Sequence, residues 1–160
     1  DYRKIYSASS KDGGGVLHDL SHDIDLIYFL LGKYEKLAAI GGKFSNLEIS
    51  SDDVFGVLIS TTLCPVVTLQ MNYLDRNAKR RILINTNKHT FELDLNEGKL
   101  FIDNNLETYK VPINQSYADM HKSILMNSDD FICSFEDGIK TLNIIQKCIN
   151  ANNSESWIKV

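Results

Sequence analysis

The segment from Gly13 to Gly32 constrains the fold of this chain more than any other stretch. Three consecutive glycines begin it, and apolar residues then recur at three- and four-residue steps, at Leu17, Leu20, Ile24, Ile27 and Leu31. This spacing predicts one amphipathic helix whose apolar stripe packs on a core, with Gly32 as its C-terminal stop.

The other faces of this predicted helix carry an unusual density of polar and titratable side chains, at His18, Asp19, Ser21, His22, Asp23 and Asp25. Asp19 and His22 are three residues apart, so on a continuous helix they would be neighbours. A carboxylate beside an imidazole stabilises the imidazolium that forms when the ring accepts a proton. The pair is therefore a candidate for proton transfer, and the alternative is a capping Asp with a surface His.

The same segment permits a metal site. His18, His22 and Asp25 stand at positions i, i+4 and i+7, which would place them on one side of the helix. Three ligands on one helix, without a fourth from elsewhere, are a weak signal for a divalent cation. His89 and His121 are each isolated in the sequence, and we interpret both as structural.

The three glycines are not a dinucleotide-binding fingerprint. His18 stands where the third glycine of that fingerprint would be, and no strand precedes Gly13. We expect the glycines to let the backbone approach another group closely, as residues without a Cβ can. No residue of this chain is therefore predicted to bind a cofactor.

Composition excludes several classes of protein. The 160 residues carry a formal net charge of −4, and basic residues cluster only at Lys79-Arg80-Arg81, so nucleic acid is not an expected partner. Three widely spaced cysteines, Cys64, Cys133 and Cys148, argue against a disulfide framework and a zinc site, and favour the reducing cytoplasm. No apolar run reaches the roughly 18 residues of a membrane span, so we expect no membrane partner.

The rest of the chain predicts an α+β fold, namely a single open, mostly antiparallel sheet with helices on one face. The expected strands are Tyr34–Phe44, Val54–Thr62, Val66–Leu74, Arg81–Thr86, His89–Leu95, Lys99–Asp103, Tyr109–Ile113 and a short one at Trp157–Val160. The expected later helices are Tyr117–Cys133 and Glu136–Asn150. Residues 54–74 place apolar side chains on both faces of the sheet, so we expect a second partner on the uncovered face, such as another copy of the chain.

Four stretches together carry a resemblance to a known family. They are the sequence GGGVLHDLSHDID with its continuation to LLG at residues 13–32, DYRKIYS at residues 1–7, Ser51-Asp52-Asp53 before a strand, and Phe135 to Ile149. They resemble the C-terminal domain of the glucose-fructose oxidoreductase, inositol dehydrogenase and MocA family. The first seven residues are similar to members associated with bacterial surface-sugar pathways. Commoner members place the His four residues after the Asp, whereas Asp19 and His22 are three apart.

The resemblance implies a fold and a chemistry. The fold would be a dihydrodipicolinate-reductase-like C-terminal domain, spanning residues 1–160, that binds substrate and oligomerises. The activity would be the oxidation of a sugar, sugar nucleotide or polyol hydroxyl with NAD or NADP, which an N-terminal Rossmann domain would hold. His22 would take the hydroxyl proton, Asp19 would orient His22, and a Lys of the Rossmann domain would complete the set. Arg3, Tyr6 and His18 would contact the substrate.

The chain has no initiating Met and begins within a motif, so we expect a piece of a longer protein that is inactive alone. Two other functions stay open. One is an oligomerisation or scaffold domain without catalysis, and the other is a metal-dependent enzyme that uses His18, His22 and Asp25.

Overall fold

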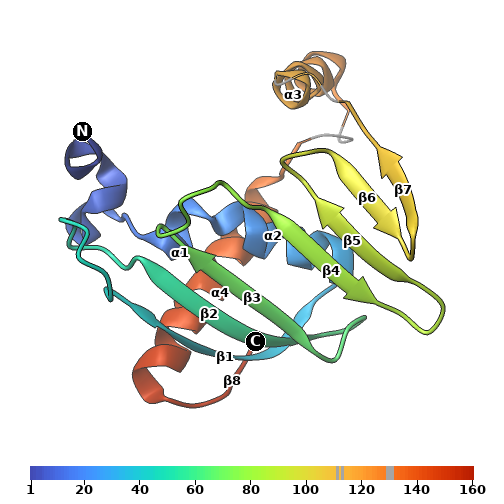
Figure 1. The fold of residues 1–160 in the computed structure, drawn as a ribbon. Helices are drawn as coiled ribbons and strands as arrows, with labels where there is room; N and C mark the ends of the chain where they lie inside the picture. The colour runs from blue at the N-terminus through green and yellow to red at the C-terminus, as the bar shows by residue number, and fades with distance from the viewer. Residues whose placement is uncertain (111, 113, 129–131) are drawn as a thin grey trace. The chain divides into compact units, whose positions relative to one another are not determined.

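Two four-stranded antiparallel sheets organise the chain, whereas the sequence predicts one (Figure 1). The computed structural model describes residues 1–110, 112, 114–128 and 132–160. The first unit comprises Asp1–Leu74 and Ser134–Val160, and the second comprises Asp75–Cys133. No strand forms between Tyr73 and Arg80, where polar and charged residues predominate, and this gap divides the predicted sheet in two.

The sheet of the first unit has the strand order β3-β2-β1-β8. Its strands are β1 (Tyr34–Gly42), β2 (Val54–Thr61), β3 (Val67–Asn72) and β8 (Ile158–Lys159). Phe55, Val57 and Ile59 alternate along β2 and are each at most 4% exposed. This is the period-two burial expected of a strand with one face on the core, and it confirms the predicted strands within one or two residues at each end.

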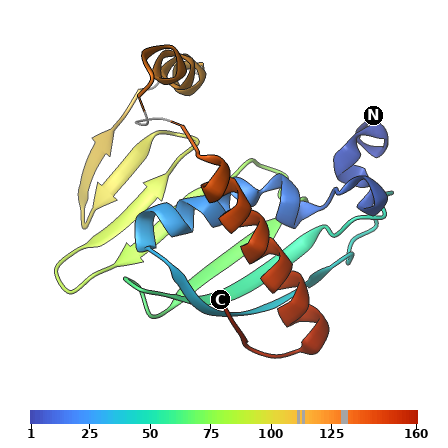
Figure 2. The same ribbon diagram turned by 180° about the vertical axis from the view of Figure 1, so that it is seen from behind.

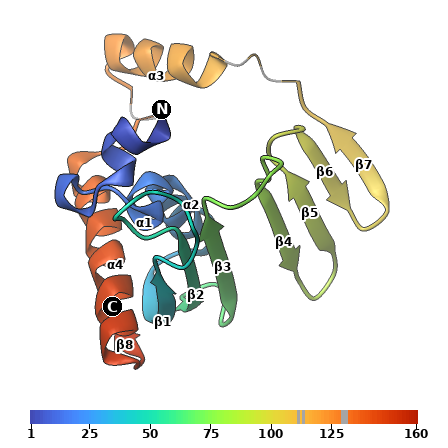
Figure 3. The same cartoon turned by 60° about the vertical axis from the view of Figure 1, so that its left-hand side comes forward.

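Helices cover one face of this sheet. The helices α1 (Val16–Asp19), α2 (Ser21–Leu31) and α4 (Phe135–Ser154) lie on the same side of β1–β3 (Figures 2 and 3). The Ser134 side chain caps α4 by accepting a hydrogen bond from the Asp137 N–H at 3.1 Å. Ile144, Ile145 and Cys148 of α4 join the buried core. Three short 3-10 turns, Tyr2–Lys4, Tyr6–Ala8 and Ser10–Asp12, precede α1.

The predicted helix over residues 17–31 is two helices rather than one. Leu20 leaves helical geometry, with φ −98° and ψ 23°, and separates α1 from α2. Leu17 and Ile24 are buried and Leu20 packs against the same core, so the apolar stripe continues across the break. The periodicity therefore could not reveal it. Because Asp19 and His22 lie on different helices, the spacing rule for a continuous helix does not apply to them.

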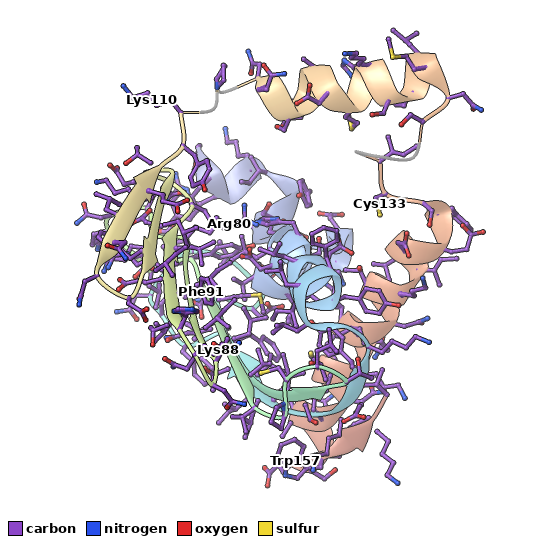
Figure 4. The ribbon with its side chains drawn as sticks, turned by 90° about the vertical axis from the view of Figure 1, so that its right-hand side faces the viewer. Arg80, Lys88, Phe91, Lys110, Cys133 and Trp157 are labelled. Carbon is purple, nitrogen blue, oxygen red and sulfur yellow. The ribbon has the colours of Figure 1, made fainter. Side chains whose placement is uncertain are left out.

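The second unit contains the other sheet, of order β4-β5-β6-β7. Its strands are β4 (Arg81–Asn85), β5 (Thr90–Asp94), β6 (Lys99–Ile102) and β7 (Asn105–Thr108). Cross-strand pairs gather apolar side chains on one face, with Ile84 opposite Phe91 and Phe91 opposite Ile102. Figure 4 labels Phe91 in this sheet.

Two predicted elements of the second unit are corrected. The strand expected at Tyr109–Ile113 is replaced by β7, because Asp103 turns the chain at φ 54° and β7 begins directly after this turn. Tyr109 and Lys110 are not in a strand. Val111 and Ile113 lie outside the described residues. The helix expected at Tyr117–Cys133 is α3 (Gln115–Met126), which ends because Asn127 adopts a left-handed cap. Asp129–Phe131 of that prediction also lie outside the described residues. In the part of the chain that the structure describes, no helix combines the length and apolarity needed to cross a membrane.

Candidate active site

The N-terminus of α1 is built against the Asp52 side chain. Asp52 Oδ2 accepts a hydrogen bond from the Leu17 N–H at 3.2 Å, and the Asp52 carbonyl accepts one from the Val16 N–H at 3.1 Å. Gly15 has φ 123°, and a Cβ at this position would collide with the Asp52 carboxylate. Only glycine combines this backbone conformation with so close an approach. The expected close approach is confirmed, and the group approached is the chain's own carboxylate.

Asp19, the last residue of α1, is held by Tyr73 from the end of β3. The Tyr73 hydroxyl donates a hydrogen bond to Asp19 Oδ2 at 2.7 Å. The Tyr73 N–H donates to the carbonyl of Asp53 at 3.0 Å, and Asp53 is fully buried. The position of the Asp19 carboxylate is thus fixed from the sheet, 54 residues away in sequence.

The 3-10 turn Tyr6–Ala8 also borders Asp19. The Ser51 hydroxyl donates to the Ser7 carbonyl at 2.6 Å and ties this turn to the strand that follows. Burial acts to raise the pKa of Asp19, but hydrogen bonds and a nearby charge outweigh it, and the net shift is downward. The groups that lower this pKa are the side chains of Ser7, Tyr73 and Tyr6 and, by its charge, His18. Asp19 is therefore a well-stabilised carboxylate at neutral pH.

Two buried side-chain atoms, one of Asp19 and one of His18, have no hydrogen-bond partner within the described residues. They are Asp19 Oδ1 and His18 Nδ1. A buried polar atom without a partner costs free energy, so each such atom calls for an explanation, and a catalytic role is one of them. A carboxylate oxygen accepts a hydrogen bond, and an imidazole nitrogen accepts or donates according to its tautomer. Each of the two atoms therefore has hydrogen-bonding capacity that the described chain does not use.

His22 lies on the first turn of α2 with its side chain 51% exposed. Its Nε2 lies 3.7 Å from Asp23 Oδ2, so the structure pairs His22 with Asp23. Asp19 instead hydrogen-bonds Tyr73. The structure thus brings Asp19, His18 and Tyr6 together and leaves the imidazole of His22 accessible from solvent.

Arg3 is engaged by two carboxylates. Its Nη2 lies 2.9 Å from Asp1 Oδ2, and its Nη1 lies 2.6 Å from Glu48 Oε2. Arg3 is half exposed, so these ion pairs contribute little to stability. Tyr6 is 62% exposed, and its side chain is near enough to Asp19 to help lower the pKa of this carboxyl.

The geometry gives the metal alternative no support. Among the residues that the structure describes, no three His, Cys, Asp or Glu side chains are arranged to hold a metal ion. Asp25 accepts a hydrogen bond from the Thr141 hydroxyl at 3.2 Å and faces α4. Asp25 also lines a hollow of about 340 Å³ between α2 and α4, which neither Asp19 nor His22 lines.

Sequence reasoning missed Tyr73, Asp52 and Ser7 as members of this site. Ser51-Asp52-Asp53 carried a family signal, but nothing in it showed that Asp52 would cap α1. Tyr73 stands near the end of a predicted strand like many tyrosines, and no local pattern connects it with Asp19. The contact of Asp52 with Leu17 spans 35 positions and that of Tyr73 with Asp19 spans 54, so only the folded chain displays them.

One comparison with known proteins identifies a family. Residues 2–100 match the family model described as the GFO/IDH/MocA C-terminal domain. No curated protein matches the sequence.

Solved structures share the fold at low sequence identity. An NAD-binding oxidoreductase from Klebsiella pneumoniae superimposes with a TM-score of 0.82 at 14% identity, covering 98% of this chain and 54% of that one. Levoglucosan dehydrogenase in complex with NADH and levoglucosan gives 0.81 at 16% identity, covering 98% and 53%. The WlbA dehydrogenase from Bordetella pertussis, in complex with NADH and UDP-GlcNAcA, gives 0.71 at 15% identity, covering 92% and 48%. The chain spans about half the length of each of these structures.

Proposed function

Because the chain belongs to the GFO/IDH/MocA C-terminal domain family, we propose that it is the substrate-side domain of a nicotinamide-dependent oxidoreductase. The substrate is a hydroxyl of a sugar, a sugar nucleotide or a polyol, and bacterial surface-glycan synthesis is the proposed setting. The structures that this chain resembles include one with levoglucosan and one with UDP-GlcNAcA, each with NADH. Their substrates share ring hydroxyls as the groups that a carboxylate and imidazoles can recognise.

One observation carries the proposal. An ionised carboxylate, Asp19, is fixed from the sheet through Oδ2, while Oδ1 and the neighbouring His18 Nδ1 are buried without partners in the described chain. A site built to hydrogen-bond a hydroxyl discriminates strongly against analogues that lack it, because its polar atoms would then stay unpaired. This arrangement favours a polyhydroxylated substrate over an apolar one.

Each residue then has a role. His22 accepts the proton of the reacting hydroxyl, since its exposed imidazole can be reached from solvent. Asp23, whose Oδ2 lies 3.7 Å from Nε2 of His22, supplies the negative charge beside the imidazolium of His22, and Asp19 accepts a substrate hydroxyl at Oδ1. His18 and Tyr6 border the bound sugar, and Arg3 lies at the rim, where it can contact an acidic substituent.

The residues of this chain do not fit a dinucleotide. The helix that follows the three glycines has four residues, and Asp52 places a carboxylate at its N-terminus. A negative charge there opposes a pyrophosphate. We therefore assign NAD or NADP to an N-terminal Rossmann domain, together with the catalytic Lys, and derive no step through the cofactor from this chain.

Substitution of His22 tests the assignment in the whole enzyme. His22→Asn should lower turnover by about 10² to 10⁴-fold, which is the usual contribution of a positioned general base. The affinity for the nicotinamide cofactor should stay nearly unchanged, because that cofactor binds elsewhere. Steady-state kinetics on a panel of sugars, sugar nucleotides and polyols, with cofactor binding by fluorescence, measures both. Full activity of His22→Asn would remove His22 from the mechanism.

His18→Ala is the matched control, because His18 and His22 would be equivalent ligands on the metal reading. On the proposed reading, His18→Ala should chiefly raise KM and His22→Asn should chiefly lower kcat. Equal loss of activity in both variants, with zinc or manganese activating only the wild type, would replace the proposal with the metal-dependent alternative.

A second candidate function rests on the uncovered face of the first sheet. Ile40 and Leu58 lie on it and are 72% and 39% exposed, and both neighbour the small residue Gly56. We propose that this face joins two copies of the chain. Sedimentation should give a dimer or larger species, and Leu58→Asp should weaken association at least about tenfold. A monomer at tens of micromolar would contradict this interface without affecting the His22 assignment.

A further inference from the structure

The function proposed above uses the position of Asp19 but assigns no part to the residue that holds it, Tyr73, whose hydroxyl links the first sheet to this candidate residue. Tyr73 follows β3 directly, and its backbone N–H is bonded to the carbonyl of the buried Asp53. Its phenol lies 2.7 Å from Asp19 Oδ2 and is partly buried. A side chain held at both ends in this way defines the position of the atom it contacts.

We propose that Tyr73 is a positioning residue that acts through Asp19, holding this carboxylate ionised and turned so that Oδ1 is its free oxygen. The inference rests on the proposed function, in which Asp19 and His22 share the handling of a substrate hydroxyl. It identifies a residue from a different element, 54 positions away, as part of the same unit.

The direction of the hydrogen bond follows from the ionisation of the two groups. Burial, the hydrogen bond to Asp19 and the negative charges of Asp19 and Asp52 all raise the pKa of Tyr73. The phenol therefore stays protonated at any pH at which the enzyme would work, and it donates. A hydrogen bond from a neutral donor to an ionised acceptor stabilises the charged form of that acceptor. Tyr73 thus cannot act as the base, and its effect is exerted on Asp19.

Several groups surround the Asp19 carboxylate, and Tyr73 differs from the others in the element from which it comes. Tyr6 and Ser7 approach from the turn before α1, His18 precedes Asp19 on α1 itself, and Asp52 faces the Tyr73 side. Tyr73 makes the hydrogen bond to Asp19 with good geometry, and it does so from the rigid sheet. Since Oδ2 is occupied, the buried Oδ1 is the oxygen that remains to accept a substrate hydroxyl.

The test is Tyr73→Phe in the whole enzyme, read out on Asp19 itself. With [4-¹³C]aspartate labelling, the Asp19 carboxyl carbon is assigned by its loss in Asp19→Asn and is then titrated. Tyr73→Phe should raise the pKa of Asp19 by about one unit, the usual effect of losing one hydrogen bond to a charged group. kcat/KM should fall, with KM rising less than kcat falls.

Tyr34→Phe is the matched control. Tyr34 is another buried tyrosine of the first unit, but its hydroxyl donates to the Ile24 backbone carbonyl at 2.9 Å. This variant should lower stability as Tyr73→Phe does, yet leave the Asp19 titration and kcat/KM nearly unchanged. An equal shift in both variants would mean that a general loosening of the fold is the cause, and would overturn the proposal.

Two further measurements keep the test decisive. In an Asp19→Asn background, Tyr73→Phe should add little further loss of kcat/KM, because residues that act as a unit are not additive; additive losses would overturn the proposal. Should Tyr73→Phe fail to fold, Asp19→Asn tests the pair from the other side, since the Tyr73 phenol should then titrate at lower pH. An unchanged Tyr73 titration would contradict the pairing.

These readouts separate the two proposals. If the wild-type enzyme oxidises no sugar or polyol, the proposed function fails, and the Asp19 titration still decides whether Tyr73 controls this carboxylate. If the enzyme is active and the titration does not move in Tyr73→Phe, the role of Tyr73 fails and the proposed function stands.

Discussion

The two sheets of this chain have the same number of strands and the same antiparallel pairing, but they differ in burial. The first sheet contains side chains that are excluded from solvent, such as Leu37 at 0% and Ile59 at 2% exposure. None of the residues of β4–β7, all of which the structure describes, reaches this level of burial. The difference follows from the helices α1, α2 and α4, which belong to the first unit and cover one face of its sheet.

This comparison separates two sources of stability. Strand pairing alone contributes modestly, because an isolated pair of strands is at best marginally stable in water and a sheet needs a hydrophobic face or a packed helix. A helix layer adds the burial of apolar surface, at about 25 cal/mol per Å². The candidate active site lies in the unit that has this layer, so its carboxylate is held by the more rigid part of the chain.

The largest expected effect comes from removing core side chains. Leu37→Ala on β1 should lower the free energy of unfolding by about 2 to 5 kcal/mol, the range for a buried leucine. Leu100→Ala on β6 removes the same atoms from a half-buried position and should cost less than half as much. Urea unfolding, with hydrogen exchange followed in each unit, measures both. Equal costs would show that the second sheet has a core of its own.

The next largest effect is that of the buried Asp53 on how the free energy of unfolding depends on pH. Burial alone would raise its pKa, but hydrogen bonds from Phe44, Ser45 and Lys43 lower the pKa to about 2. Because the pKa is lower in the folded chain than in the unfolded one, Asp53 stabilises the fold above about pH 4, and this contribution is lost as the pH falls towards 2. The loss should reach about 2 kcal/mol.

Unfolding measured from pH 6 to pH 2 tests this, with Asp53→Asn expected to flatten the acid limb. Asp103 is the counterpart in the second unit, because the hydrogen bond from His89 lowers the pKa of Asp103 too. Asp103 is 48% exposed, so Asp103→Asn should change the acid limb much less. A larger effect at Asp103 would contradict the link between burial and acid sensitivity.

The contrast between the units also explains what the sequence could predict. Period-two alternation at Phe55, Val57 and Ile59 has a cause within the strand itself, so β2 was predicted correctly. The division into two sheets was not predicted. Each strand of the second unit has a normal strand pattern, and this pattern does not show which other strand it pairs with. The break at Leu20 left the apolar stripe intact and was invisible for that reason.

The candidate site divides in the same way. Asp19, His18 and His22 were found because they lie within one 20-residue segment whose motif is recognisable. Tyr73 was not found, because its relation to Asp19 depends on where β3 ends against α1. What the sequence lacks is the tertiary contact, and this contact decides which carboxylate oxygen is free.

The smallest expected effect concerns the edge strands, where the two sheets again differ. β8 contributes two residues to the edge of the first sheet. Trp157 comes just before β8 and is labelled in Figure 4, and Lys36 Nζ of β1 lies 5.2 Å from the centroid of its ring. β7 forms the corresponding edge of the second sheet with four residues, all exposed. An interaction between a cation and an aromatic ring at an exposed site contributes about 0.5 to 1 kcal/mol.

Lys36→Met keeps the aliphatic stem and removes the charge, so it should lower the free energy of unfolding by this amount. It should also speed hydrogen exchange at Val160, whose N–H is bonded to the carbonyl of Glu35. Exchange in β7 should not change, because nothing in this contact reaches the second unit. If Lys36→Met leaves the exchange of Val160 unaltered, the edge of the first sheet is held by backbone pairing without help from this contact.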